Sequence, residues 1–303
     1  MTVPRNELTF TSHGVRCAAW HLPATSGALA GPGGRPCVVM AHGFGGTRDT
    51  GLLGYAEPFA EAGMDVLAFD YRGFGDSEGA PRQDVSVRRQ REDYHAAIDA
   101  ARLLPGVDPD RIALWGTSYS AGHAVVVAAQ RPGITAVASM TPAADGLASL
   151  LLIARGHGAG HLFRLAVHGI VDVVGSLVGR RPHALPVVGR PGAAAMITVP
   201  GAEEIYTSLA GPTWRNEVCA RHALEVARNR PVAHARRVRC PVLVQIGTED
   251  RVVPVGAARR MARRLGRRAV VEEYPVDHFD VYDGPWRQKA LADQIAFFGR
   301  TLR

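Results

Sequence analysis

The sequence lacks the features that mark several large classes of protein. Its cysteines are widely spaced, form no CxxC pair and are limited to Cys17, Cys37, Cys219 and Cys240. We therefore expect small buried thiols in a reducing compartment, rather than disulfides or a metal cluster. The opening stretch, MTVPRNELTFTSHG, contains no apolar core of signal-peptide length. These absences predict a cytoplasmic protein without an export signal.

The chain also lacks an apolar run long enough to cross a bilayer. Its most apolar region, residues 147–178, is interrupted by Arg155, His157, His161, Arg164, His168 and Asp172. The formal charge of +7 is accompanied by no aromatic-interleaved basic strip and no zinc-finger spacing. The densest basic patch, GAARRMARRLGRR at residues 256–268, instead predicts the exposed face of an amphipathic helix. We expect neither a membrane span nor a nucleic-acid partner.

Strands and helices alternate along most of the 303 residues, which are enough to bury a full core. Residues 7–23 predict an antiparallel hairpin that turns at His13 and Gly14. Apolar runs without polar alternation, separated by helical patterns, follow at residues 37–43, 65–73, 111–118, 134–142, 240–250 and 269–278. Such strands indicate an α/β fold, with a mostly parallel central sheet and helices on both faces.

The alternation stops between about residues 142 and 236. This segment contains apolar helical pieces, a Pro- and Gly-rich middle (GRRPHALPVVGRPG) and a tryptophan, Trp214, in GPTWRNEV. A long insertion within a βα series predicts a helical cap over an active site. We therefore divide the chain into a first core part at 1–141, a cap at 142–236 and a second core part at 237–303.

A serine stands at the joint between a predicted strand and a predicted helix, in RIALWGTSYSAGH at residues 111–123. A tight turn there would expose the hydroxyl of Ser118 above the carboxyl edge of the sheet, where the helix aims its first amides. The pattern is G-x-S-x-S, with Ser120 at the position where G-x-S-x-G is usual. Ordinary Gly/Ser turns share this pattern, so a nucleophilic role for Ser118 depends on further residues.

A glycine-rich loop, HGFGG at residues 42–46, follows the early strand at 37–41. Its flexible backbone can point the amide of Phe44 inward, where it would join the amide of Tyr119 in binding an oxyanion. The alternative is a plain glycine turn. His42 opens the loop and is expected close to the site, as a contact to substrate rather than as the catalytic base.

Two late strands are followed by residues that complete a catalytic set. Asp250, in GTEDRVVP, comes directly after the strand at 240–247, and its rivals for the acid are Glu249 and Asp145. His278 follows the next strand at its carboxyl end, where an imidazole can reach both Ser118 and Asp250. Asp250 is favoured because its pattern places it at the start of the loop. His123 lies in the helix after the serine and is expected to be a packed histidine.

The chain resembles the α/β-hydrolase superfamily. The matching pieces are HGFGG, DYRGFGDSEG, GTSYSAGH, GTEDRVVP and DHFD, in the order of the family. They cover the chain outside residues 142–236, the region where caps vary. Within the superfamily it is similar to bacterial serine carboxylesterases and peptidase-like hydrolases, and less closely to polyketide acyl-transfer enzymes. The resemblance implies the chain order Ser118, Asp250, His278 for the triad.

The leading prediction is a serine hydrolase that cleaves a carboxylic ester or thioester through an acyl-enzyme on Ser118. The reaction requires no cofactor, and no residues show metal-ligand spacing. Acyl transfer and amide or peptide cleavage use the same residues and stay open. A non-catalytic binding protein is the alternative from another class, and dehalogenase chemistry is disfavoured because it needs an aspartate in place of Ser118.

The predicted substrate is a small molecule with an apolar acyl or alcohol group. This follows from the Leu, Val, Ala and Ile content of the predicted cap. Trp214 and His42 are its candidate substrate-binding residues, although apolar caps are also apolar simply because they must pack.

Overall fold

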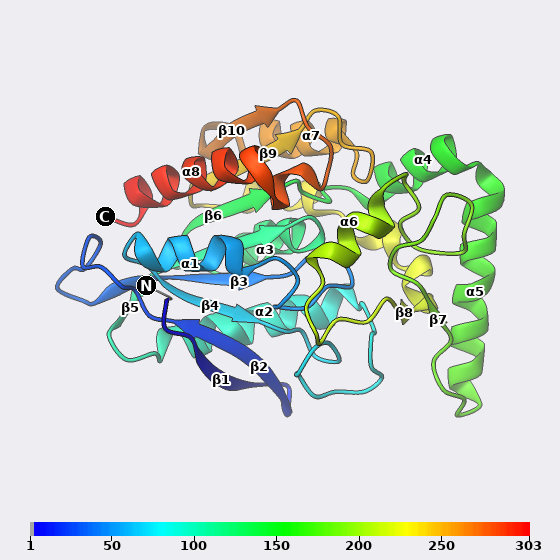
Figure 1. The fold of residues 1–303 in the computed structure, drawn as a ribbon, viewed down its shortest axis with the longest axis horizontal. Helices are drawn as coiled ribbons and strands as arrows, with labels where there is room; N and C mark the ends of the chain where they lie inside the picture. Colours follow the sequence, from blue (N-terminus) through cyan, green and yellow to red (C-terminus); the bar gives the residue numbers. More distant parts are fainter. Residues whose placement is uncertain (1–2) are drawn as a thin grey trace.

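The computed structural model describes residues 3–303, so residues 1 and 2 of the first predicted core part lie outside it. An eight-stranded sheet forms the centre of the molecule (Figure 1). Its strands, in spatial order, are β1 (Asn6–Ser12), β2 (Val15–Leu22), β4 (Asp65–Phe69), β3 (Arg35–Ala41), β5 (Val107–Thr117), β6 (Ile134–Met140), β9 (Val242–Gly247) and β10 (Ala269–Tyr274). The pairs β1–β2 and β2–β4 are antiparallel and all other pairs are parallel. The predicted hairpin and mostly parallel sheet are confirmed.

Helices cover both faces of the sheet, as predicted. The helices on one face are α1 (Leu53–Glu61) and α8 (Gly284–Thr301), and those on the other are α2 (Val87–Arg102), α3 (Tyr119–Gln130) and α7 (Val255–Leu265). Successive side chains of a strand point to opposite faces, so Val39 of β3 joins one core and its neighbour Met40 joins the other. Burial on both faces explains why these strands read as continuous apolar runs.

The strand β5 begins four residues before the predicted start at residue 111. The polar run Asp108-Pro109-Asp110 conceals this extension in the sequence. It lies in a bulge, because Arg35 of β3 pairs with Val107 whereas Cys37 pairs with Ile112. An irregular register lets polar residues continue a strand without following the apolar pattern.

Between β6 and β9 the chain forms a separate group of elements. They are α4 (Gly146–His157), α5 (Ala159–Leu177), β7 (Ala184–Leu185), α6 (Ala202–Leu209), β8 (Val218–Cys219), and the 3-10 turns η1 (Ala220–Leu224), η2 (Val226–Arg228), η3 (Pro231–Ala233) and η4 (Ala235–Arg237). Figure 1 shows α4, α5 and α6 together at one end of the sheet. The strands β7 and β8 were not predicted, since two-residue strands carry no periodicity. The turns η3 and η4 pack against α7 of the core.

The helix α7 follows its predicted amphipathic pattern. Met261 and Leu265 are buried, whereas the arginine pairs on either side of Met261 are exposed. Two further 3-10 turns, η5 (Gly266–Arg268) and η6 (Asp280–Tyr282), flank β10. None of the helices within residues 3–303 combines the length and apolarity that a membrane crossing requires.

Candidate active site

Ser118 lies at a strained turn between β5 and α3. Its backbone has φ +54°, a region that L-residues other than glycine rarely adopt. Gly116 allows this turn, because a Cβ there would collide with the backbone carbonyl of Ser120. The turn is also anchored to β6, since the N–H of Ser118 donates to the carbonyl of Met140 at 2.8 Å. These backbone constraints hold the Ser118 hydroxyl at the carboxyl edge of the sheet.

Ser120, which departs from the usual glycine, has a structural role in this turn. Its Oγ donates to the carbonyl of Ala41 at 2.7 Å and accepts from the N–H of Thr117 at 2.9 Å. These two bonds connect the end of β5 to the end of β3. Serine at this position therefore links β5 to β3 and leaves the turn at Ser118 intact.

Ser118, His278 and Asp250 form a continuous hydrogen-bonded triad. The Nε2 of His278 lies 3.0 Å from Ser118 Oγ, and its Nδ1 lies 2.6 Å from Asp250 Oδ2. All three side chains are buried, although they come from the ends of three different strands. Because the carboxylate accepts a hydrogen bond from Nδ1, the other ring nitrogen is free to accept the proton of the serine hydroxyl.

Asp250 is the candidate acid that contacts His278. Its second oxygen, Oδ1, accepts from the backbone N–H groups of Val252 at 2.8 Å and Val253 at 2.7 Å. The carboxylate thus begins the loop before α7 and faces the imidazole at the same time. Its rivals lie elsewhere: Glu249 is exposed, and Asp145 caps α4 by accepting from the N–H of Leu147 at 3.2 Å.

The loop after β3 passes directly over Ser118. A Cβ on Gly43 would lie 3.4 Å from the Cβ of Ser118. Within residues 3–303, neither the amide of Phe44 nor that of Tyr119 donates to a backbone carbonyl. Phe44 and Tyr119 carry the two amides that the sequence predicted as oxyanion donors. Neither amide is used in a backbone hydrogen bond, and the two segments that carry them meet at Ser118.

Two residues of the 142–236 segment hold this loop from outside. Tyr206 Oη donates to the carbonyl of Phe44 at 2.7 Å, and Trp214 Nε1 donates to the carbonyl of Gly45 at 3.0 Å. The rings of Tyr206 and Trp214 stack with their centroids 5.3 Å apart. The segment therefore supports the loop through directional bonds as well as apolar contacts.

Both predicted substrate-binding residues are placed differently from the sequence-based expectation. Trp214 does not line the cavities beside the triad, because its indole packs on Tyr206 behind the loop. His42 is also absent from those walls: it is buried against Tyr71, and its Nδ1 lies 3.0 Å from the carbonyl of Gly43. Burial lowers the pKa of His42 to about 4, so the ring is neutral near pH 7. Both residues support the loop.

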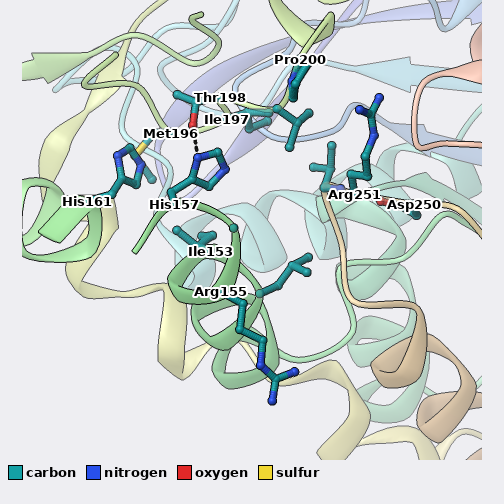
Figure 2. Close-up of a pocket in the computed structure, with 14 residues that line it drawn as sticks. Ile153, Arg155, His157, His161, Met196, Ile197, Thr198, Pro200, Asp250 and Arg251 are labelled. Carbon is teal, nitrogen blue, oxygen red and sulfur yellow. Dashed lines mark hydrogen bonds between the residues drawn. The ribbon is translucent and has the colours of Figure 1, made fainter. Parts of the chain in front are cut away.

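Three adjoining cavities surround the triad. The outer cavity, of about 460 Å³, lies between the end of α4, residues 196–200 and the loop that carries Asp250 and Arg251 (Figure 2). The His222 cavity, of about 90 Å³, reaches from Ser118 to His222. The His278 cavity, of about 20 Å³, lies on the other side of the serine. Ile197 lines all three, so this side chain separates the spaces around the nucleophile.

The residues that define these cavities were missed by sequence reasoning. Ile197 and its neighbour Met196 belong to an irregular stretch outside the named strands, which pairs with residues 186–189 through backbone hydrogen bonds and a bridge from Ile197 to Val188. His222 is one of twelve histidines and lies in a short 3-10 turn. Neither Ile197 nor His222 lies in a periodic pattern or a sequence motif, so nothing in the sequence indicated that they line these cavities.

The His222 cavity ends at a buried polar group. The Nδ1 of His222 donates to the carbonyl of Val85 at 2.7 Å, which leaves Nε2 to accept from Tyr119 Oη at 3.4 Å. Burial lowers the pKa of His222 to about 4. His123, the histidine expected to be packed, is buried with its ring 4.9 Å from that of Tyr119. The side chain of Tyr119 is thus held between His123 and His222.

The site joins a serine at a strand–helix turn to a histidine and an aspartate that follow later strands of a mostly parallel sheet. This arrangement defines an α/β hydrolase. The comparisons with known proteins agree. The chain belongs to the family described as "Serine aminopeptidase, S33", whose profile matches residues 34–276. Within residues 3–303, no group of three or more His, Cys, Asp or Glu residues is arranged to hold a metal ion.

Proteins similar to this chain include a quorum-quenching protein, a thiohydrolase and an α/β hydrolase of known structure. The quorum-quenching protein AidA of Acinetobacter baumannii (strain MDR-ZJ06) is 35% identical over 301 residues, covering 98% of this chain and 95% of its own. The thiohydrolase aneE of Aspergillus aculeatus is 41% identical over 107 residues, or 35% of this chain and 34% of its own. The crystal structure of the α/β hydrolase GrgF from Penicillium sp. sh18 has a TM-score of 0.81 and 24% identity, with 99% of both chains covered. These matches confirm the predicted fold.

Proposed function

We propose that this protein is a serine hydrolase that cleaves a small carboxylic ester or thioester through an acyl-enzyme on Ser118. The observation that carries the proposal is the hydrogen-bonded path from Ser118 Oγ through His278 to Asp250, at 3.0 Å and 2.6 Å. These are the separations that a general base needs in order to take a proton from a nucleophile.

In the first half-reaction, Ser118 Oγ attacks the substrate carbonyl while His278 Nε2 takes the hydroxyl proton. Asp250 stabilises the resulting imidazolium, and the amides of Phe44 and Tyr119 donate to the oxyanion. When the intermediate collapses, the C–O or C–S bond breaks and His278 returns the proton to the departing alkoxide or thiolate. Water, deprotonated by the same imidazole, then hydrolyses the acyl-enzyme and releases the carboxylic acid.

The chemistry of the cavity walls favours an ester or thioester over the substrate of an aminopeptidase. An aminopeptidase must hold the ammonium group of its substrate, for which a carboxylate near the nucleophile is the usual partner. Among the lining residues of the three cavities, all within residues 3–303, the one carboxylate is Asp250. Both oxygens of Asp250 are already bonded, one to His278. The walls are otherwise mostly apolar, which suits an apolar acyl or alcohol group.

The thioester option draws support from the thiohydrolase relative, and the ester option from the apolar walls. Acyl transfer to an alcohol or amine uses the same first half-reaction and differs only in the acceptor. The outer cavity, at about 460 Å³, has room for an acceptor and adjoins the two cavities at Ser118 through Ile197. Acyl transfer is therefore the second candidate function.

The 142–236 segment would act as the cap of this enzyme. It supplies Ile197, Met196 and Ile153 to the cavity walls and Tyr206 to the loop that presents Phe44. It supplies none of the three triad residues. Such a cap contributes binding energy and excludes water, and it leaves the proton transfers to the core.

Two measurements test the proposal. A fluorophosphonate probe should label the wild-type protein and leave Ser118→Ala unlabelled, whereas a protein that only binds ligands would not react. A panel of p-nitrophenyl esters, their thioester analogues and an aminoacyl p-nitroanilide should then show turnover of esters or thioesters. Preference for the anilide would contradict the assignment in favour of a peptidase. Product analysis with added alcohol separates hydrolysis from acyl transfer.

A further inference from the structure

The helix α5 has two faces with opposite surroundings. Its inner face packs closely on the turn η1, where a Cβ on Gly169 would lie 2.9 Å from Leu224 Cγ and 3.1 Å from the carbonyl of Ala220. On the same face, the buried carboxylate of Asp172 accepts hydrogen bonds from the backbone and guanidinium of Arg221. This buried pairing fixes the helix in one orientation. The inner face of α5 is therefore covered by η1.

The outer face of α5 is apolar and exposed. Its central row, which we name the α5 seam, consists of Phe163, Val167, Ile170, Val174 and Leu177. These side chains are between 41% and 80% exposed, and Val171 and Val178 beside them are exposed as well. Together they present roughly 700 Å² of surface, more than the roughly 300–600 Å² of the largest apolar patch on a typical monomer. Figure 1 shows α5 at the outer edge of the molecule, with α4, α6 and β7 between it and the sheet.

The spacing of the α5 seam indicates what covers it. The steps of four, three, four and three residues are those of the apolar seam between paired helices. The row is also nearly symmetric about Ile170, because Phe163 lies seven residues before it and Leu177 seven residues after it. Two antiparallel copies of α5 related by a two-fold axis would therefore place Ile170 against its own counterpart and Phe163 against Leu177. The surface is self-complementary.

We propose that the α5 seam is the interface through which two copies of this chain form a dimer. Two copies would bury at most about 1,400 Å² of these side chains, an upper bound that lies within the range of about 1,200–2,000 Å² found in stable interfaces. A membrane surface fits less well. Between Phe163 and Val178 the one lysine or arginine is Arg164, and its guanidinium donates to the carbonyls of Gly192 and Ala193. Helices that lie on lipid instead carry several basic residues along their polar face. A fixed helix with an uncharged, self-complementary row suits a second copy.

The charge variant Ile170→Asp tests the interface at its centre. The wild-type protein should sediment as a dimer, and Ile170→Asp should raise the dimer dissociation constant by about 100-fold or more, because two carboxylates would meet unpaired at the axis. Ile170 is 52% exposed, so the variant should keep its circular dichroism spectrum and still unfold cooperatively as a monomer. The matched control is Leu103→Asp, which changes an 84% exposed leucine at the end of α2 and should leave the dimer intact.

Mixing two variants tests the two-fold geometry. Ile170→Lys alone should be monomeric, and an equimolar mixture with Ile170→Asp should restore a dimer, because opposite charges then face each other across the axis. The proposal is overturned if the wild type stays monomeric at high concentration, or if Ile170→Asp dimerises as tightly as the wild type. Failure of the mixture to dimerise also contradicts it. A monomer that binds phosphatidylglycerol vesicles through α5 would replace the dimer with a lipid surface.

Discussion

At the carboxyl edge of the sheet, polar groups are held by hydrogen bonds, whereas the 142–236 segment reaches the same cavities mainly with apolar side chains. Asp250 accepts from two backbone amides as well as from His278. Ile197 and Ile153, by contrast, present only hydrocarbon to the cavities. Directional bonds fix atoms to within fractions of an ångström, while apolar packing fixes shape and volume. We therefore expect the proton transfers to depend on the carboxyl edge of the sheet and selectivity among acyl groups to depend on the apolar side chains of the 142–236 segment.

The largest effect should follow from removing the nucleophile. Ser118→Ala should lower kcat for ester hydrolysis by about a million-fold, the usual loss when a triad nucleophile is removed. The fold should persist, because the hydroxyl points out of the turn and is not part of the hydrophobic core. Steady-state kinetics and a thermal melt on the same preparation measure both quantities. Activity within tenfold of wild type would remove Ser118 from the mechanism.

The next largest effect should come from the acid. Asp250→Asn should lower kcat by about ten-thousand-fold, because an amide can present its N–H to His278 and favour the wrong imidazole tautomer. The control, Asp145→Asn, removes a charge that is paired with Arg230 at 3.0 Å and caps α4, so it should lower stability while leaving kcat within a few-fold. Glu249→Gln should change neither quantity much. If Asp145→Asn were the variant that lost activity, the triad would be wrongly assigned.

These two regions also differ in how far the sequence predicted them. Ser118 and Asp250 follow strands that are buried on both faces, so an apolar run locates both residues at the carboxyl edge of the sheet. His278 follows the outer strand β10, which is only partly buried but ends at the same edge. The geometry then follows from the topology. The role of Ser120 was not foreseen, because the bond from its hydroxyl to Ala41 depends on the distance between two strands.

Within the 142–236 segment, composition predicted apolar helices but not their contacts. Trp214 was a candidate substrate-binding residue because it lies in the predicted apolar cap, and its indole N–H bonds to Gly45. Ile197 reaches the cavities from a stretch without regular pairing, which no periodicity can locate. An aromatic or aliphatic side chain has no unique partner in the sequence, since tertiary packing decides where it lies.

A comparison of Ile197 with Trp214 sharpens the division between rate and selectivity. Ile197→Ala should change the ratio of kcat/KM for a long and a short acyl ester by about 10- to 200-fold, because pocket contacts worth roughly 1–3 kcal/mol are lost. Trp214→Phe keeps an aromatic ring at this position and removes the hydrogen bond to Gly45, so it should lower kcat/KM for both esters by a similar factor. An unchanged ratio in Ile197→Ala would mean that the cavities it lines do not hold the acyl group. A chain-length effect in Trp214→Phe would return that residue to the substrate site.

The smallest effect concerns pH and a histidine that joins the two regions. His222, in the 142–236 segment, is buried and bonded to Val85 of the core, and burial lowers its pKa from about 6.5 to about 4. The unfolded chain therefore binds a proton between these values that the folded chain does not, so the free energy of unfolding should fall as the pH is lowered from 6.5 toward 4. The loss from this one group between pH 7 and pH 5 is on the order of 2 kcal/mol.

His222→Gln, which cannot be protonated in this range, should reduce the change in the free energy of unfolding between pH 7 and pH 5, measured by chemical denaturation, by that amount. His42→Gln, which changes a core histidine with a similarly lowered pKa, should flatten it equally if the protein unfolds in one step. If His42→Gln reduced the pH dependence of the free energy of unfolding and His222→Gln did not, the 142–236 segment would separate from the core before the sheet unfolds.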